Sequence, residues 1–385
     1  MVNGSNLEDR TTPALLGWAP LLVGAVSSYG GIAFNYGFAL YFLDYRHGFV
    51  KRGLEGELLS GVAFLSRGSL LAIEYIFLAI AFAMTYFVFR GMLFGTLSEC
   101  KLAVALLSAP ALLPHLGFMF AQPDVTLYIL LLGCIVLFVR ASPGIAAVAS
   151  CLLCCVALLA HEAFCLMFYP LIVAILWHLC ARKRLPWLAG VAHVLVVAAV
   201  FAAVMHWGGL KISPDAMLHE ARARTDVGVE RQVYDVMASS LAEQRALVRH
   251  MYTPGVLRVL VLTVLLSVPY FALLVRLLHG AMRDAGFGRM QRLGTAILFV
   301  SPLLLCALGH DTTRWIGAMC IDATLMVLYL YLTESKDSAT RRSLLDWASG
   351  PSFLMWLVYL IAVGPYGATG MRTAEQMVET WFRSN

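Results

Sequence analysis

Long uncharged apolar runs dominate the chain, and this feature limits the folds that it can adopt. Of its 385 residues, 60% are hydrophobic and only 13% are charged, about half the charged fraction of a soluble globular protein. Apolar runs of about 17–25 residues, the length that crosses a bilayer as a helix, number about eleven. The predicted spans are 17–43, 69–89, 102–121, 125–139, 144–160, 163–180, 187–206, 255–278, 293–309, 315–333 and 352–368. The sequence therefore predicts an all-α, polytopic transmembrane helical bundle that forms one integral membrane domain, 1–385.

The stretch 143–180 is too long to be a single span. As one helix it would extend about 57 Å, nearly twice the roughly 30 Å hydrocarbon core of a bilayer. The polar pair His161 and Glu162 lies near its middle. We therefore expect two short spans with a turn at this pair.

The basic residues predict the orientation of the spans. Lys and Arg collect in short cytoplasmic loops, and a cytoplasmic N-terminus places most of the basic loops on that side. These loops contain Arg90, Lys101, Arg140, Arg182, Lys183, Arg184, Arg283, Arg289, Arg292, Lys336, Arg341 and Arg342. The outer face then receives a first loop (44–68), with an interfacial amphipathic helix over 54–66, and a long loop (207–253) with one or two surface helices. Almost every isolated polar feature falls on this outer face, so we expect the protein to work there.

Composition also excludes some classes of function. The net charge is +5, and the basic residues are spread over many short loops, which is typical of membrane topology and argues against nucleic-acid binding. The nine cysteines lie in or beside apolar segments without the spacing of a disulfide framework or a zinc site.

The first loop has the densest group of charges. Asp44 ends the first predicted span and is followed at once by cations, which would keep its carboxylate ionised and directed at a ligand. Alternatively, Asp44 has a structural role and caps the next turn or pairs with Arg46. Arg46, His47, Lys51 and Arg52 suit a phosphate or pyrophosphate, or else they contact anionic lipid headgroups without specificity.

Two further outer turns contain acids. Asp124 follows Pro123 at the start of a predicted span, where it either caps the helix or acts as a second carboxylate that holds a divalent ion or the acceptor. His161 and Glu162 form an ionisable pair, which membrane helices seldom keep without a partner. The second histidine of a zinc protease motif is missing. The pair is thus either a structural polar turn or part of the site.

The last outer cluster contains His310, Asp311 and Arg314. We predict that these three residues bind a lipid-linked donor phosphate, with Arg314 as its clamp. Simple pairing of Asp311 with Arg314 is the alternative. Glu74 and Asp322 lie within predicted spans, and such carboxylates usually pair with a base such as Arg314 or line a water-filled cavity.

This arrangement resembles the membrane glycosyltransferases of the GT-C superfamily, mainly over residues 17–140. The resemblance rests on the predicted cytoplasmic N-terminus, Asp44 in the first loop, the amphipathic segment 54–66 after it, and Asp124 in the next outer turn. It implies transfer of a sugar from a polyprenyl-phosphate or pyrophosphate donor to a glycan or lipid acceptor. It also implies a bacterial inner membrane with the active face toward the periplasm or exterior.

The chemistry implied by the resemblance needs a general base and cations for the leaving phosphate. Asp44 fits the base, and Lys51, Arg52 and Arg314 fit the phosphate clamp. Family members often have two adjacent acids in the first loop, whereas Asp44 stands apart from the next acids. A divalent cation such as Mg²⁺ or Mn²⁺ is therefore left open, with Asp44 and Asp124 as its candidate ligands.

Two other functions fit the same pattern. A polysaccharide polymerase or ligase of the O-antigen type would also work on the outer face, and the arginines of the long loop suit it. A membrane transporter, which belongs to a different class, would need charged residues near the bilayer midplane. Glu74 and Asp322 are the hints of such residues.

Overall fold

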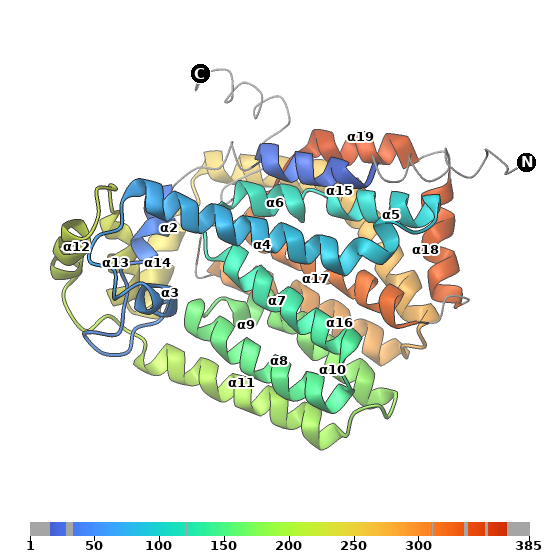
Figure 1. Cartoon of the computed structure of the whole chain (residues 1–385), viewed down its shortest axis with the longest axis horizontal. Helices are drawn as coiled ribbons and strands as arrows, with labels where there is room; N and C mark the ends of the chain where they lie inside the picture. Colours follow the sequence, from blue (N-terminus) through green and yellow to red (C-terminus); the bar gives the residue numbers. More distant parts are fainter. Residues whose placement is uncertain are drawn as a thin grey trace, which may run out of the picture.

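The protein is a bundle of helices. The computed structural model describes residues 16–27, 34–120, 122–307, 309, 311–334, 338–350 and 353–367, and within these residues it contains no β-strand. The chain order can be followed in Figure 1. The helices are Leu16–Ser27, α2 (Phe34–Leu40), α3 (Leu54–Leu58), α4 (Arg67–Leu93), α5 (Leu97–Leu107), α6 (Leu113–Phe118), α7 (Asp124–Arg140), α8 (Pro143–Ala160), α9 (Phe164–Met167), α10 (Tyr169–Ala181), α11 (Trp187–Trp207), α12 (Pro214–Ala223), α13 (Arg231–Ala238), α14 (Leu241–Met251), α15 (Pro254–Asp284), α16 (Arg289–Val300), the 3₁₀ helix η1 (Ser301–Ala307), α17 (Thr312–Thr333), α18 (Ala339–Ser349) and α19 (Phe353–Val363).

Six helices of the described chain are long and apolar enough to cross a membrane: α4, α8, α11, α15, α16 with η1, and α17. The chain is therefore a helical integral membrane protein, as the sequence predicted. The sequence predicted about eleven spans, which is more than these six long helices, because some apolar runs divide into shorter helices. The run 102–121 divides into α5 and α6, and the run 163–180 divides into α9 and α10. The predicted turn at His161 is confirmed, since α8 ends at Ala160.

Hydroxyl side chains mark where several of these helices begin. Ser66, Ser213 and Thr253 each accept a hydrogen bond from the backbone N–H three residues further on. Thr96 and Ser240 form capping boxes, in which a glutamate three residues later bonds back to the cap. Such caps satisfy backbone donors that a helix cannot satisfy itself.

The most deeply buried long helix is α17. Its most apolar window is 83% buried, whereas the other five candidate spans are 22–39% buried. It contacts α15, η1, α10, α16 and α7. The surrounding helices expose large apolar side chains such as Leu152, Leu195 and Leu265. An outward apolar surface around a buried axis is the arrangement that a hydrocarbon environment favours.

One end of the bundle, here called the α18 end, gathers basic side chains that the sequence assigned to a common face. Arg90 and Arg140 both lie over the Phe87 ring, at 4.7 and 6.0 Å from its centroid. Arg341 of α18 donates a hydrogen bond of 2.7 Å to Glu99 at the start of α5. Residues from four helices therefore meet at this end.

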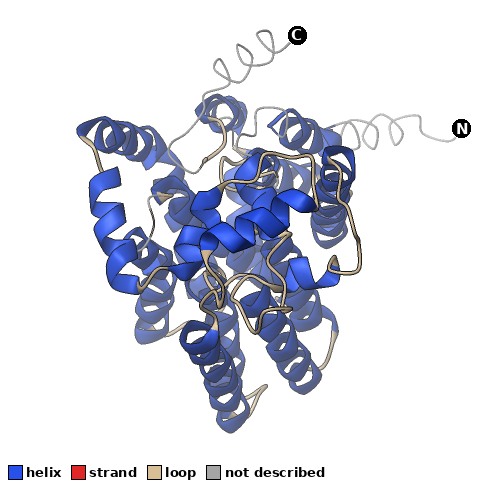
Figure 2. Cartoon of the chain, turned by 90° about the vertical axis from the view of Figure 1, so that its left-hand side faces the viewer, coloured by secondary structure: helices blue, strands red, loops and turns tan. Residues whose placement is uncertain are grey.

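The opposite end, here called the loop end, is covered by α3, α12, α13 and α14, which lie together at the left of Figure 1. Figure 2 views the molecule from this end. The long loop (207–253) forms three helices instead of the predicted one or two. The expected amphipathic helix over 54–66 is helical only in α3. Backbone hydrogen bonds join the two loops: Lys51 N–H to Gly208 O at 2.9 Å, and Leu65 N–H to Arg224 O at 2.8 Å. The first loop and the long loop thus form one layer.

Gly56 allows α3 to pack directly on the backbone of Leu43, just before the first loop. A Cβ at this position would lie 1.9 Å from the carbonyl oxygen of Leu43, whereas a Cβ at Gly61 would meet nothing within 4 Å. Gly56→Ala should therefore lower the free energy of unfolding by about 1–3 kcal/mol, the usual cost of overpacking. Unfolding in detergent, with Gly61→Ala as the matched control, measures the difference. Equal stability of the two variants would contradict the close contact.

Candidate functional site

The described residues include three arginine–carboxylate pairs at the loop end, each joining distant parts of the chain. Their partners are separated by 110, 190 and 180 residues along the sequence. The pairs are Arg52 with Glu162, Arg314 with Asp124, and Arg224 with Asp44. Removing ions from water is costly even when they are paired, so three pairs at one end indicate a site that is built for charge.

Arg52 of the first loop reaches the turn between α8 and α9. Its Nε lies 2.9 Å from Glu162 Oε2 and its Nη2 lies 2.6 Å from Oε1, so the contact is bidentate. Both side chains are nearly buried, at 13% and 12% exposure. The backbone of Arg52 has φ 61°, a left-handed conformation that costs a non-glycine residue about 1–2 kcal/mol. Such strain persists where surrounding contacts hold it, and it is common at functional sites.

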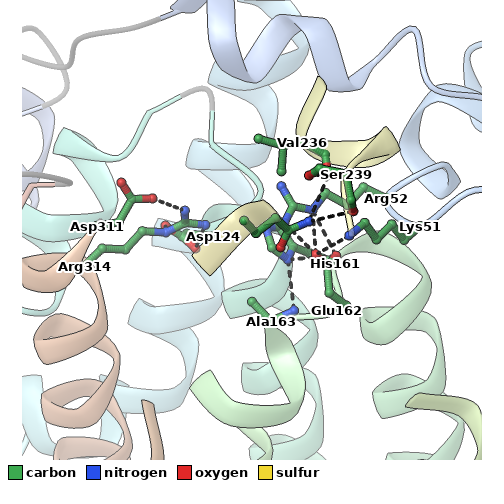
Figure 3. Close-up of polar contacts among 11 residues, drawn as sticks. Lys51, Arg52, Asp124, His161, Glu162, Ala163, Val236, Ser239, Asp311 and Arg314 are labelled. Carbon is green, nitrogen blue, oxygen red and sulfur yellow. Dashed lines mark hydrogen bonds and ion pairs between the residues drawn. The ribbon is translucent and has the colours of Figure 1, made fainter. Parts of the chain in front are cut away.

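Lys51 and His161 complete this group, which Figure 3 shows in close-up. Lys51 Nζ lies 4.0 Å from Glu162 Oε1 and makes no hydrogen bond within the part of the chain that the structure describes. The Ala163 N–H donates to Nδ1 of His161 at 3.0 Å. Burial, and then the charge of Arg52, lower the pKa of His161 well below its ordinary value, so the ring is neutral near pH 7.

The surroundings favour the charged form of Glu162 but disfavour the charged form of Lys51. Burial raises the pKa of Glu162, but the charge and hydrogen bonds of Arg52 lower it further, and the carboxyl stays ionised well below its ordinary pKa. Burial lowers the pKa of Lys51, and Glu162 offsets this only in part. The lysine is thus a cation that its surroundings compensate incompletely.

Arg314, in the first turn of α17, forms the second bidentate pair. Its Nε donates to Asp124 Oδ2 at 2.6 Å and its Nη2 to Oδ1 at 2.7 Å, while Nη1 donates to Asp311 at 3.1 Å. Asp124 therefore binds arginine and does not cap its helix, since α7 begins without a side-chain cap. Figure 3 shows this group beside that of Arg52, and the charge of Arg314 also contributes to lowering the pKa of His161.

Asp44 is fully buried between two arginines. Its Oδ2 accepts from Arg46 Nε at 2.8 Å and from Arg224 Nη1 at 3.1 Å, and its Oδ1 accepts from the backbone N–H of Arg46 at 3.2 Å. Burial raises its pKa, but these hydrogen bonds and charges outweigh burial and lower it. The predicted cations Arg46 and His47 face the surface, where His47 lies 2.9 Å from Glu220. The pairing of Asp44 with Arg46, considered from sequence, is thus present.

Sequence reasoning missed Glu55 and His115. Glu55 is buried in α3, and its Oε1 has no hydrogen-bond partner among the described residues. Burial raises its pKa, which the nearby side chain of Thr126 lowers only in part. Thr126 follows Asp124 in the first turn of α7. His115 has Nδ1 2.7 Å from the carbonyl oxygen of Tyr366, and within the described chain its Nε2 has no partner. The acid in an amphipathic segment was the only sequence signal for Glu55, and His115 had none.

The two acids within predicted spans do not pair with Arg314. The Tyr41 hydroxyl donates to Glu74 at 2.7 Å. Asp322, in the middle of α17, is fully buried, and neither of its carboxyl oxygens has a hydrogen-bond partner among the residues described. His310, a predicted phosphate ligand, lies outside the described residues.

The two predicted metal ligands do not fit a divalent cation. Asp44 and Asp124 each direct their oxygens at arginine donors. Among the residues that the structure describes, no group of three His, Cys, Asp or Glu side chains could hold a metal ion. The donor set thus suits an anion better than a cation.

Comparisons with protein-family models, curated proteins and solved structures gave no match. The side chains themselves indicate what the loop end can bind. An anionic group can replace a carboxylate at a guanidinium and can take the ammonium of Lys51 as a further donor.

The contribution of the Arg52–Glu162 pair to stability can be compared with that of an exposed ion pair. Arg52→Gln should lower the free energy of unfolding by about 3–5 kcal/mol, because Glu162 then stays buried without its counter-charge. Arg231 is the matched control: its pairs with Asp215 and Asp235 are about half exposed or more, and Arg231→Gln should cost at most about 1 kcal/mol. Titration with SDS in mixed micelles measures both. A small and equal effect of the two changes would mean that water reaches the Arg52 pair.

Proposed function

We propose that the protein is a membrane glycosyltransferase that moves a sugar from a polyprenyl-phosphate or pyrophosphate donor to a glycan or lipid acceptor. The observation that carries this proposal is the group of buried cations Lys51, Arg52 and Arg314 at one end of a membrane bundle. A lipid-linked phosphate lies at the membrane surface, within reach of such an end. The cations also oppose the negative charge that the phosphate gains as the sugar leaves.

The three cations offer complementary contacts to phosphate. Arg52 and Arg314 present planar guanidinium groups, which bind phosphate oxygens in the same bidentate manner in which they now bind carboxylates. Lys51 adds a point charge that no hydrogen bond occupies in the described chain. Because the group is largely buried, each interaction is stronger there than in water.

Transfer also needs a proton acceptor. The acceptor hydroxyl oxygen forms a bond to the anomeric carbon, the bond from that carbon to the phosphate oxygen breaks, and the phosphate leaves with the electron pair. A carboxylate takes the hydroxyl proton. Asp44 suits this step poorly, because arginine and backbone donors occupy both its oxygens and lower its pKa.

Glu55 suits the step better. One of its oxygens has no partner in the described chain, and burial raises its pKa toward the working pH. It lies near Thr126 in the first turn of α7, the turn that also holds Asp124 and through it Arg314. We assign Glu55 as the general base, and Asp44 as the ion that fixes the first loop to Arg224.

Glu55→Gln should therefore lower turnover by about 10²–10⁴-fold, because the amide cannot accept the proton. A base works only when ionised, so wild-type turnover should rise with pH through the raised pKa of Glu55, and this acid limb should be absent from the residual activity of the variant. The measurement is sugar transfer in reconstituted membranes with a polyprenyl-phosphate sugar donor.

Glu57→Gln is the matched control for this experiment. Glu57 lies on the same helix and accepts a hydrogen bond from the Tyr45 backbone N–H. The amide oxygen of glutamine can accept the same bond, so turnover of the Glu57→Gln variant should stay near the wild-type value. Full activity of a well-folded Glu55→Gln protein would exclude the general base. Activity lost in Asp44→Asn but kept in Glu55→Gln would return the role to Asp44.

A transporter is the second candidate, and the observation that favours it is Asp322. An unpartnered carboxyl inside a membrane helix is typical of proton-coupled carriers. Asp322→Asn distinguishes the two candidates. If the protein is a glycosyltransferase, sugar transfer should be unchanged in this variant. If it is a proton-coupled carrier, uptake should be abolished.

We further propose that the loop end faces the periplasm or exterior of a bacterial inner membrane, with a cytoplasmic N-terminus. Buried arginine–carboxylate pairs lie at the loop end. Arg90 and Arg140, which have no acidic partner among the described residues, lie at the α18 end, as the positive-inside rule expects. A membrane-impermeant maleimide should label Glu230→Cys in intact cells and Arg342→Cys only after permeabilisation. Wild-type protein gives the background of the native cysteines. The reverse pattern would place the site in the cytoplasm.

A further inference from the structure

A second binding feature lies away from the loop end, between α15, α16 and α17. It is a groove of about 440 Å³, the size of a small-ligand pocket. Apolar side chains form most of its lining, including Leu278 and Met282 of α15, Leu293 and Phe299 of α16, and Ala323 of α17. Leu293 is exposed on the outer surface of the bundle. The groove therefore borders the surface that faces hydrocarbon.

Positive charge marks the part of the groove nearest the α18 end. Arg289, Arg292 and His279 line it there, and no acidic residue is among the described residues that line it. Arg292 Nη1 lies 3.4 Å from His279 Nε2. Arg289 and Arg292 are three residues apart in the first turn of α16, so both project from the same side of a helix end that itself favours anions.

The dimensions of the groove restrict its occupant. Its lining on α15 runs from Phe271 to Met282, which is about 17 Å of helix and close to half of a hydrocarbon core of about 30 Å. A helix of that length and about 10 Å in diameter would fill roughly 1,300 Å³. A single hydrocarbon chain, about 4 Å wide, would fill roughly 200 Å³. A volume of about 440 Å³ matches one or two such chains better than a helix.

We propose that this groove binds an anionic glycerophospholipid of the adjacent leaflet. The headgroup phosphate lies between Arg289 and Arg292, and an acyl chain runs along the groove toward Phe299. Charge complementarity at one end and apolar length along the rest select this ligand over a neutral lipid. The site is independent of sugar transfer, because it lies at the α18 end and shares no residue with the loop-end cations.

The test measures the affinity of the delipidated, purified full chain for phosphatidylglycerol by native mass spectrometry. Phosphatidylcholine with the same acyl chains and inorganic phosphate are the comparison ligands. Phosphatidylglycerol should bind at least roughly tenfold more tightly than phosphatidylcholine, and millimolar phosphate should not displace it. Arg289→Gln with Arg292→Gln should remove this preference. Ala296→Phe, at a residue that lines the groove, should weaken binding of both lipids with the charges intact.

Matched changes outside the groove should have no effect. Arg283 lies at the same end but pairs with Asp284, and Ile297 is exposed beside Ala296. Arg283→Gln and Ile297→Phe should therefore bind phosphatidylglycerol as the wild type does. Equal affinity for the two lipids, displacement by phosphate alone, or a dimer of the chain that forms in place of lipid binding would each overturn the proposal. So would unchanged binding in both groove variants.

Discussion

A charge buried away from bulk solvent needs a counter-charge from the protein itself, and the loop end depends on this requirement. The first loop supplies Arg52 and Asp44, whose partners Glu162 and Arg224 come from a turn and from the long loop. Each pair therefore fixes a segment that local structure leaves without a defined position. Because a bidentate contact also sets direction, these pairs orient the first loop as well as hold it.

Pairing also divides the acids of the protein into two groups. Asp44 and Glu162 have arginine partners that keep them ionised. Glu55 is buried, and one of its oxygens has no partner among the described residues, so its pKa shifts in the opposite direction. Acids with separated pKa values can divide electrostatic and proton-transfer roles between them. The proposed chemistry uses this difference, with paired acids as structural ions and Glu55 as the proton acceptor.

The buried helix α17 links the two binding features. Its first turn carries Arg314 at the loop end, and Cys320 and Ala323 further along line the groove between α15, α16 and α17. The C-terminal segment also contacts its start, where Thr313 donates to the Gly367 carbonyl oxygen at 2.5 Å. A helix so fully packed has little freedom to move alone. Both features thus have a rigid element as one wall, which is what precise placement of ligand groups requires.

The sequence by itself determined the class of the protein and the composition of its two ends. Long apolar runs require helices in a membrane, and the distribution of Lys and Arg predicted which basic residues lie together. It also identified Arg52, Asp124, Glu162 and Arg314 as residues of interest. It did not determine the number of long helices, since hydropathy does not register a turn between two apolar segments such as α5 and α6. Only the tertiary structure decided which acid meets which arginine, because partners up to 190 residues apart along the chain have no local signal. For the same physical reason, the burial of Glu55 and Asp322 without full pairing was visible only in the folded bundle.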